Sequence, residues 1–532
     1  MSSKEGMSQG SKSVLKRPAP PYMTLPVEVC SCMTPRYIYL AFSDKESYHQ
    51  VIHLRWVRSD KSTCLEWAVF KILNKRPPPK PVWVNVFGRA EPQLTSVDTK
   101  LGPFEFYTRA SRLHPFSFIL ESLTGPQEMA EITVMGFDPS KVVRFYADRL
   151  TVETRDTKEE IRTTRPLNEI KNLMRRSNDR TYRYLGGAVG VVNYDAISLW
   201  EKVPCSHPTQ KPLMEFGIYD DGIIYDHRNK KTLYFHYGKN RYDQLDLTPS
   251  PVESFSATDA HPDTTSREFA AMVDRAKQLI YSGDIFQVVL SRRFNFNMKG
   301  DPLAVYRVLR RMNPSPYMYH LRHSNRRILG ASPEMLVRVT GDVVETFPIA
   351  GTRKITDDEA KNLELERELL CDEKELAEHT MLVDLGRNDV GRVCRYGTVR
   401  VRDLMSVQRF SHVQHMVTHV TGTLDPQKDM FDAFRAVFPA GTVTGAPKVR
   451  AMEIINDLET SSRGPYAGAV GYFSYNGCCD FAIAIRSIFT QGGRGYVQSG
   501  AGIVSDSMSS AEFQETEHKA SAMIHALKEA SA

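Results

Sequence analysis

Four glutamates in the C-terminal half of the chain form two pairs with the same spacing. Glu375 and Glu378 are three positions apart, as are Glu512 and Glu515, and Lys519 follows the second pair. Residues at this spacing share one face of a helix. Two such faces that meet would present carboxylate oxygens, which are the ligands that Mg²⁺ prefers. Because glutamates are usually exposed, an ordinary charged helix surface is the competing interpretation.

Each pair lies in a stretch that favours a helix. Residues 364–392 begin with strong helix formers and contain neither proline nor glycine before Gly386. The glutamates of residues 510–528 recur at helical spacing. The magnesium hypothesis therefore requires two helices that are distant in sequence and adjacent in the fold.

The composition is that of a soluble globular protein and excludes several classes of function. The 532 residues are 41% hydrophobic and 25% charged, with a net charge of +6. No basic cluster with interleaved aromatics indicates nucleic-acid binding, and no apolar run is long enough to span a membrane. The eight cysteines form no Cys-x-x-Cys pair typical of zinc sites. Without a recognisable signal peptide, a cytoplasmic location is expected.

The length predicts more than one domain. Residues 1–20 are rich in Ser, Lys and Gly, and we expect them to be disordered. Residues 247–265 are rich in Pro, Ser and Thr and form the clearest linker. This linker ends an N-terminal region (21–265) and precedes a C-terminal region (266–532).

Strands and helices follow one another without a regular rhythm. Apolar runs predict strands at 36–42, 116–120 and 186–194, whereas the charged residues 151–182 predict helix with loops. Apolar residues at helical spacing predict an amphipathic helix over 266–282. Because a parallel sheet would show regular strand–helix alternation, we expect an α+β fold with large antiparallel sheets.

The loop at 440–448 only superficially resembles a nucleotide-binding P-loop, because its glycines have the wrong spacing.

Seven further motifs follow one another in a fixed order. The motifs are Phe-Pro-Ile-Ala-Gly-Thr-Arg (347–353), Glu-Leu-Ala-Glu-His (375–379), Asp-Leu-Gly-Arg-Asn-Asp (384–389), Gly-Thr-Val-Thr-Gly-Ala-Pro-Lys (441–448), Gly-Ala-Val-Gly-Tyr-Phe (468–473), Asp-Phe-Ala-Ile-Ala-Ile-Arg (480–486) and Gly-Ala-Gly-Ile-Val (500–504). Together they closely resemble the chorismate-utilising enzymes, and most closely the anthranilate synthase large subunits. The resemblance is dense over 266–532 and thinner before it.

The resemblance implies a fold, a cofactor and a reaction. The fold would be a β-sandwich-like core of large antiparallel sheets surrounded by helices. Chorismate would lose its ring hydroxyl, gain an amino group next to the ring carboxylate, and release pyruvate to give anthranilate for tryptophan biosynthesis. Mg²⁺ would hold the ring carboxylate, with Glu378 and Glu515 as main ligands and Glu375 and Glu512 beside them.

The resemblance also implies roles for single residues. Glu334 matches the general acid on the leaving hydroxyl, a task that needs a raised pKa; alone, a glutamate after Pro333 would suggest a turn carboxylate. His415 matches the histidine of pyruvate elimination, with His412 and His419 as neighbouring competitors. The other matched positions are a catalytic hydroxyl at Thr442 and substrate contacts at Gln287, Gly351, Thr352, Tyr466, Arg486, Gly500, Gly502 and Lys519. For Lys519, a structural salt bridge is an equally good interpretation.

Two positions separate the predicted reaction from those of similar enzymes. Water-using relatives carry a lysine at the position of Gln287, and a neutral amide has no pKa in the range of a general base. Aminodeoxychorismate synthases carry a nucleophilic lysine at the position of Ala350. Direct amination by ammonia is therefore favoured. The alternatives are an aminodeoxyisochorismate synthase, an aminodeoxychorismate synthase and a regulatory protein that binds chorismate or tryptophan.

The sequence also predicts partners. It contains no glutaminase nucleophile motif, so glutamine-dependent activity would need a separate amidotransferase subunit and a hetero-oligomer. A tryptophan feedback site is implied at Glu121, Ser122, Pro316, Tyr317, Met318, Val470 and Tyr472. The chain departs from the family pattern after Ser122, and an insertion is predicted near residues 45–112 because the spacing there is unusually long.

Overall fold

This computed structural model describes residues 37–43, 49–59, 62–71, 90–124, 131–204, 211–249, 254–409 and 413–532. For the first three of these ranges it describes the backbone alone. The predicted tail at 1–20 and His412 lie outside the described residues. The chain divides into two compact units, Met1–Val86 and Phe87–Ala532.

The first unit contains a three-stranded antiparallel sheet. Its strands are β1 (Tyr37–Ser43), β2 (His49–Ser59) and β3 (Ser62–Lys71), in the order β1-β2-β3. The β2–β3 register shifts between Arg55 and Trp56. Strands β2 and β3 fall within the predicted insertion near 45–112.

The second unit contains two large sheets whose described strand pairs are all antiparallel. In spatial order the strands of the first sheet are β21 (Ile349–Lys354), β23 (Val413–Thr423), β20 (Val343–Thr346), β19 (Met335–Thr340), β26 (Cys479–Ile483), β25 (Ala469–Ser474), β10 (Gly187–Val192), β11 (Met214–Tyr219), β7 (Lys141–Phe145), β8 (Arg149–Glu153) and β9 (Lys158–Arg162), with β22 (Arg400–Arg409) on β23.

The second sheet follows the same antiparallel pattern. Its strands are β14 (Ser256–Ala257), β16 (Gln287–Lys299), β28 (Arg494–Ile503), β27 (Ser487–Gln491), β18 (Arg326–Ser332), β17 (Tyr317–His323), β5 (Phe116–Glu121), β6 (Ile132–Phe137), β12 (Asp221–Asp226), β13 (Lys231–His236) and β4 (Gln93–Ser96), with β15 (His261–Pro262) and β24 (Gly445–Ala446) on β16. One hydrophobic core joins buried residues of both sheets, such as Val189 of β10 and Leu290 of β16. The predicted α+β fold with large antiparallel sheets is confirmed.

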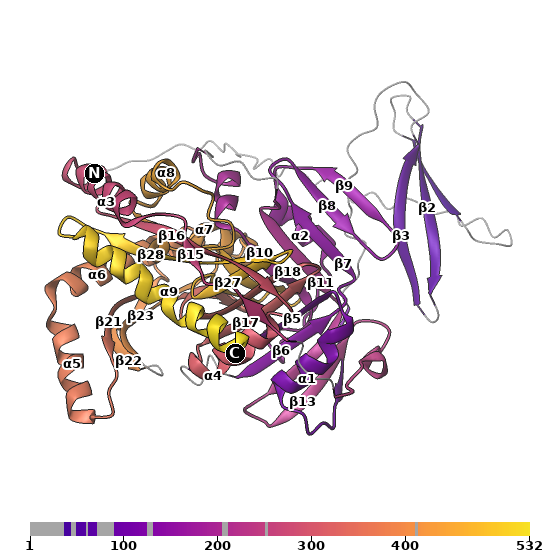
Figure 1. Cartoon of the computed structure of the whole chain (residues 1–532). Coiled ribbons are helices and arrows are strands. Elements are labelled where there is room, and N and C mark those ends of the chain that lie inside the picture. The colour runs from indigo at the N-terminus through magenta and orange to yellow at the C-terminus, as the bar shows by residue number, and fades with distance from the viewer. Residues whose placement is uncertain are drawn as a thin grey trace, which may run out of the picture. The chain divides into compact units, whose positions relative to one another are not determined.

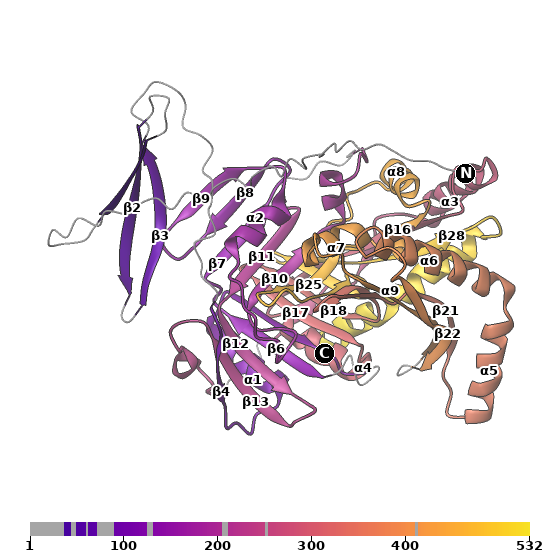
Figure 2. The ribbon, with the colours of Figure 1, turned by 180° about the vertical axis from the view of Figure 1, so that it is seen from behind.

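Helices surround these sheets (Figure 1, Figure 2). The α-helices are α1 (Pro103–Ala110), α2 (Pro166–Leu173), α3 (Ser266–Tyr281), α4 (Leu303–Met312), α5 (Glu359–Cys371), α6 (Glu373–Gly391), α7 (Met430–Val437), α8 (Lys448–Leu458) and α9 (Ser509–Ser531), and the 3₁₀ turns are η1 (Ser111–Leu113), η2 (Tyr194–Leu199), η3 (Tyr242–Gln244) and η4 (Gly441–Val443). Among the described residues, no helix is both long and apolar enough to cross a membrane.

Three features differ from the expectation or refine it. Residues 151–182, predicted as helix with loops, contain the end of β8 and all of β9, with only α2 as an α-helix. Charged residues suit β9 because it is an edge strand whose side chains alternate towards solvent. The stretch 364–392 is two helices, because Asp372 ends α5 and its carboxylate caps the backbone N–H groups of Lys374 and Glu375.

The predicted linker does not separate two sheets. Both large sheets contain strands from before and after residue 265, and β14 and β15 of the linker pair with β16. Thr265 begins α3 through a capping box with Glu268. Residue 265 therefore lies inside the second compact unit.

Candidate active site

The two glutamate pairs are carried by α6 and α9. Helix α6 packs on β21 and β23, and α9 packs on β28. Figures 1 and 2 show α6, β28 and the N-terminal end of α9 at the same end of the molecule. Lys374 of α6 lies close enough to Glu512 of α9 to lower the pKa of that carboxyl group. The fold therefore brings two helices distant in sequence to one place, as the spacing requires.

In each pair, the carboxylate of the second glutamate opposes ionisation of the first. Burial and the charge of Glu378 raise the pKa of Glu375, and burial and Glu515 raise that of Glu512. Glu375 also accepts a 3.3 Å hydrogen bond from Arg353, and Glu515 forms a 2.5 Å ion pair with Lys519. Among the residues that the structure describes, no three or more His, Cys, Asp or Glu side chains gather closely enough to hold a metal. Carboxylates are suitable ligands for Mg²⁺, but two of the four, Glu375 and Glu515, are bound to Arg353 and Lys519 in this structure.

Glu334 occupies the short turn between β18 and β19. Its side chain is buried, with 7% of the residue exposed. Burial raises the pKa of this carboxyl group to about 8, whereas the nearby Thr442 hydroxyl and the Lys519 ammonium oppose the rise. The group therefore carries a proton at neutral pH and has the property that a general acid requires. Thr442 and Lys519 are two of the other predicted site residues.

His415 is held against a glycine of β21. Its Nδ1 atom lies 2.9 Å from the Gly351 carbonyl oxygen and 3.1 Å from Thr352 Oγ1. A carbonyl only accepts, so Nδ1 carries the proton and Nε2 remains a base. Burial lowers the pKa of His415, and the charges of Arg486 and Lys519 lower it further. His415 is therefore a neutral base at neutral pH.

Only a glycine fits well at position 351, because of its backbone conformation and the atoms packed around it. Its φ is +67°, and a Cβ there would lie 2.6 Å from Leu369 Cδ1 and 3.2 Å from Glu375 Oε2. The β21–β23 register shifts between Ala350 and Thr352, on either side of this glycine. The shift allows the backbone to approach both His415 and the α6 carboxylate.

A cationic side of the site is formed by β28, α9 and the segment before β27. Lys519 donates to the Gly500 carbonyl oxygen at 3.1 Å, and the Tyr466 hydroxyl lies 2.9 Å from where a Gly500 Cβ would be. Arg486 has a left-handed φ of +51°, and its half-buried guanidinium lies near the Tyr466 phenol and the Glu515 carboxylate. These groups are placed to hold a carboxylate.

Gln287 begins β16 next to the α6 carboxylates. Its Nε2 donates to Glu378 Oε1 at 2.8 Å. Its Oε1 is buried and has no hydrogen-bond partner among the described residues. A Cβ at Gly502 would lie 2.6 Å from Gln287 Nε2, so this glycine makes room for the amide.

The other histidines near His415 have different surroundings. His419 stacks on Phe347 at 4.1 Å between ring centroids and pairs with Glu345 at 2.9 Å. His419 lies in β23 and Glu345 in the adjacent strand β20, so the ion pair holds the His419 ring against the sheet. Arg353, whose guanidinium contacts Glu375, was not singled out, although it ends the Phe-Pro-Ile-Ala-Gly-Thr-Arg motif.

A separate cavity of about 60 Å³ brings together all the residues of the predicted feedback site. Its lining includes Glu121, Ser122, Pro316, Tyr317, Met318, Val470 and Tyr472. It also contains an ion pair that the sequence did not suggest, between Arg338 of β19 and Asp480 of β26, at 2.7 Å. Arg310 fixes Glu121 by two hydrogen bonds of 2.6 and 2.9 Å. The cavity thus combines apolar walls with fixed polar groups.

The geometry agrees with what comparison with known proteins shows. A model of the family described as chorismate binding enzyme matches residues 115–525, and the chain belongs to this family. It is 42% identical over 451 residues to anthranilate synthase component 1 of Methanothermobacter thermautotrophicus, which covers 84% of this chain and 97% of that protein. It is 38% identical over 455 residues to aminodeoxychorismate synthase component 1 of Bacillus subtilis, covering 81% and 95%.

A solved structure supports the same assignment. The crystal structure of anthranilate synthase component I from Streptococcus pneumoniae TIGR4 superimposes with a TM-score of 0.67 at 36% identity. The match covers 80% of this chain and 97% of that one. The two-sheet architecture is therefore that of a solved family member.

Proposed function

We propose that this chain is the large component of an anthranilate synthase, which converts chorismate and ammonia to anthranilate and pyruvate in tryptophan biosynthesis. The proposal rests on two observations together, the hydrogen bond from Gln287 to Glu378 and the raised pKa of Glu334. The amide is neutral and does not act as a base towards water. Ala350, in β21 of the other large sheet, offers no nucleophilic amine. Ammonia is itself a nucleophile, so it needs neither a base to activate it nor an amine on the enzyme.

Amination requires that the ring hydroxyl leave. Glu334 donates its proton to this hydroxyl, which departs as water while ammonia bonds to the ring carbon next to the carboxylate. The raised pKa suits this step, because the donor must be protonated before it acts. Thr442 and Lys519 lie beside Glu334 and stabilise the carboxylate that results.

Pyruvate release requires a base and groups that bind the enolpyruvyl part of the substrate. His415 Nε2 takes the proton from the aminated carbon, and the bond from the ring to the enolpyruvyl oxygen breaks, so the ring becomes aromatic. The enolpyruvate that leaves takes up a proton and becomes pyruvate. Arg486 and Tyr466 bind the enolpyruvyl carboxylate, for which a guanidinium is well suited. Gly351, Thr352, Gly500 and Gly502 line the proposed substrate site.

Magnesium is the cofactor we propose. Glu378 and Glu515 would hold it, with Glu375 and Glu512 beside them, and the ion would neutralise the ring carboxylate of chorismate. The raised pKa values of Glu375 and Glu512 beside a second carboxylate support this assignment, because a nearby cation relieves the repulsion between the two charges. The enzyme would be a magnesium-dependent lyase.

We propose three further properties of the working enzyme. A separate glutamine amidotransferase subunit supplies ammonia in a hetero-oligomer, since the sequence lacks a glutaminase motif. Tryptophan occupies the cavity that contains Glu121 and Tyr472 and inhibits the reaction. The enzyme works in the cytoplasm.

An assay with ammonia tests the proposed reaction directly. Purified protein with chorismate, Mg²⁺ and an ammonium salt at alkaline pH should form fluorescent anthranilate, and the same mixture without ammonium should not. Failure to form anthranilate in the complete mixture would contradict the proposal.

Product mass separates anthranilate from the products of the alternatives. An aminodeoxyisochorismate or aminodeoxychorismate synthase would retain the enolpyruvyl group, and both of these products have the same mass. A regulatory protein would bind chorismate or tryptophan without turnover. The aminodeoxychorismate alternative has support from the Bacillus subtilis relative, whereas Ala350 argues against it.

A further inference from the structure

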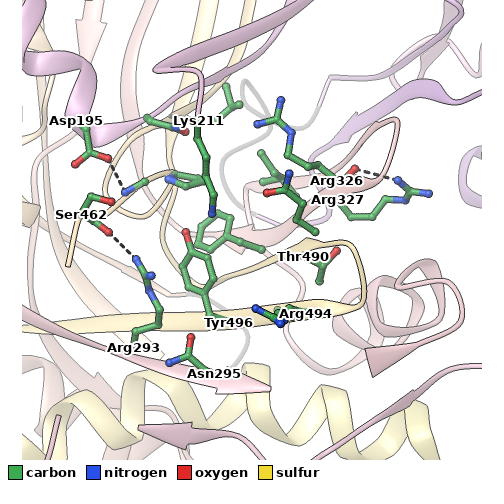
Figure 3. Close-up of a pocket in the computed structure, with 18 residues that line it drawn as sticks. Asp195, Lys211, Arg293, Asn295, Arg326, Arg327, Ser462, Thr490, Arg494 and Tyr496 are labelled. Carbon is green, nitrogen blue, oxygen red and sulfur yellow. Dashed lines mark hydrogen bonds between the residues drawn. The ribbon is translucent and has the colours of Figure 1, made fainter. Parts of the chain in front are cut away.

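A cavity of about 410 Å³ lies among residues that have no part in the proposed catalytic or feedback sites. None of its 18 lining residues belongs to either set (Figure 3). Asp195 is the one acidic residue among them. The cationic residues of the lining are Lys211, Arg293, Arg326, Arg327 and Arg494. A volume of this size suits a small molecule.

The register of the second sheet brings these cations together. Arg326 begins β18 and Arg494 begins β28, and both lie opposite Gln491 of the strand between them. Arg293 of β16 pairs with Gln498 of β28, so its side chain joins the same region. Lys211 comes from the segment before β11 and points towards the arginines (Figure 3).

The positive charges are close enough to affect one another. Partial burial and the charges of Arg293 and Arg326 lower the pKa of the Lys211 ammonium. The Arg293 guanidinium lies 4.0 Å over the Tyr496 ring and donates to the Ser462 carbonyl oxygen at 2.7 Å. These contacts fix its position through uncharged partners, and Asp195 is an acidic group close enough to interact with its charge.

The acidic groups nearby do not balance this charge. Asp195 accepts a 2.8 Å hydrogen bond from the Gly464 backbone N–H, and burial raises the pKa of its carboxyl group to about 6. Glu215 pairs with Arg326, but it also pairs with Arg144 and His323. Among the described residues that line the cavity, the cationic side chains therefore outnumber the acidic ones.

We propose that this cavity binds a small polyanion, a molecule that carries two or more phosphate or carboxylate groups. Guanidinium groups form paired hydrogen bonds with either kind of oxyanion. Cations held side by side repel one another, and an anion between them removes that repulsion. Phe489 and Tyr496 add an aromatic wall, and Asn295 and Thr490 add neutral hydrogen-bonding groups. The proposal does not depend on the reaction proposed above.

Titration calorimetry of the full-length protein tests the proposal. Pyrophosphate and citrate are the probes, because they separate a phosphate ligand from a carboxylate ligand. The titrations contain no Mg²⁺ and are compared with NaCl at equal ionic strength. We expect saturable binding of at least one probe, weaker at higher salt. If neither probe binds at millimolar concentration, the proposal is wrong.

Variants then place the bound anion. Lys211→Gln with Arg494→Gln removes two exposed cations of the cavity and should weaken binding about tenfold or more. Lys239→Gln with Lys428→Gln removes two exposed cations elsewhere and should leave binding unchanged. An equal loss in both double variants would show diffuse attraction and overturn the proposal.

Two single variants complete the test. Asp195→Asn removes the acidic group while keeping an acceptor for Gly464, so we expect several-fold tighter binding, which misfolding would not produce. Lys519→Gln, in the catalytic site, should have no effect. If Lys519→Gln abolishes binding instead, the anion occupies the catalytic site and the cavity assignment is wrong.

Discussion

Replacing Glu334 by glutamine should make the protein more stable and nearly inactive. The carboxyl group is buried in the turn between β18 and β19, next to Thr442 and Lys519. A glutamine has almost the same shape and stays neutral at every pH. The substitution therefore removes the proton and the charge of Glu334 while it keeps the packing.

The structure gives the size of the effect on stability. Burial raises the pKa of Glu334 from 4.5 to about 8. Since the folded-state pKa lies above the unfolded value, the wild type loses stability as the pH rises from about 4.5 through about 8. This difference corresponds to at most about 5 kcal/mol, and entry of water makes the measured value smaller. Glutamine avoids this loss, so its advantage is absent at pH 4.5 and largest above pH 8.

Two measurements check the prediction. The kcat for anthranilate formation with ammonia should fall about 10²- to 10⁴-fold, the usual contribution of a general acid. Urea unfolding at several pH values should show a stability gain that grows with pH. The matched control is Glu364→Gln, which neutralises an exposed glutamate paired with Lys361 at 2.8 Å. That control should change stability by less than about 1 kcal/mol at every pH.

Either of two results would refute the reasoning. If Glu334→Gln keeps its kcat, another group protonates the leaving hydroxyl. If its stability relative to the wild type is independent of pH, the carboxyl group has an ordinary pKa and burial does not prepare it for catalysis.

Three more substitutions test other parts of the structure. Glu378→Ala should abolish turnover and weaken Mg²⁺ binding at least about tenfold, as measured by calorimetry; unchanged Mg²⁺ affinity would remove this residue from the ligand set. Met318→Ala should raise the tryptophan concentration for half-inhibition several-fold, because it enlarges the proposed tryptophan cavity, with kcat unchanged in the absence of tryptophan; equal inhibition of both proteins would place the inhibitor elsewhere. Arg463→Met should destabilise the fold by about 3–5 kcal/mol in urea unfolding, because it removes the guanidinium that lies 2.6 Å from the buried Glu459 carboxylate and balances its charge; a loss below about 1 kcal/mol would contradict this account.

Local patterns in the sequence were sufficient for much of the secondary structure. Apolar residues at helical spacing identified α3, whose first residues are also fixed locally by the capping box of Thr265 and Glu268. The strands β5 and β10 were read from their apolar runs. Such elements depend on neighbours a few positions away, which a sequence displays directly.

The same patterns gave the wrong secondary structure where residues distant in sequence determine it. The charged residues of β9 form a strand because β8 provides hydrogen-bond partners on one side and solvent receives the side chains. Asp372 interrupts a stretch of strong helix formers because its carboxylate caps α6 and its neighbour Arg353 comes from β21. Helix propensity depends on the residues of the segment itself and takes no account of β8 or Arg353.

The sequence by itself determined the family, the order of the motifs and the residue types available for chemistry. It marked Glu334 and His415 as candidates, but their protonation states follow from burial and from charges on other elements. The cavity that holds Lys211, Arg293 and Arg494 leaves no local signal, because the register of strands distant in sequence brings these cations together. A pKa and a cluster of charges depend on distances in space, and only the tertiary structure sets those distances.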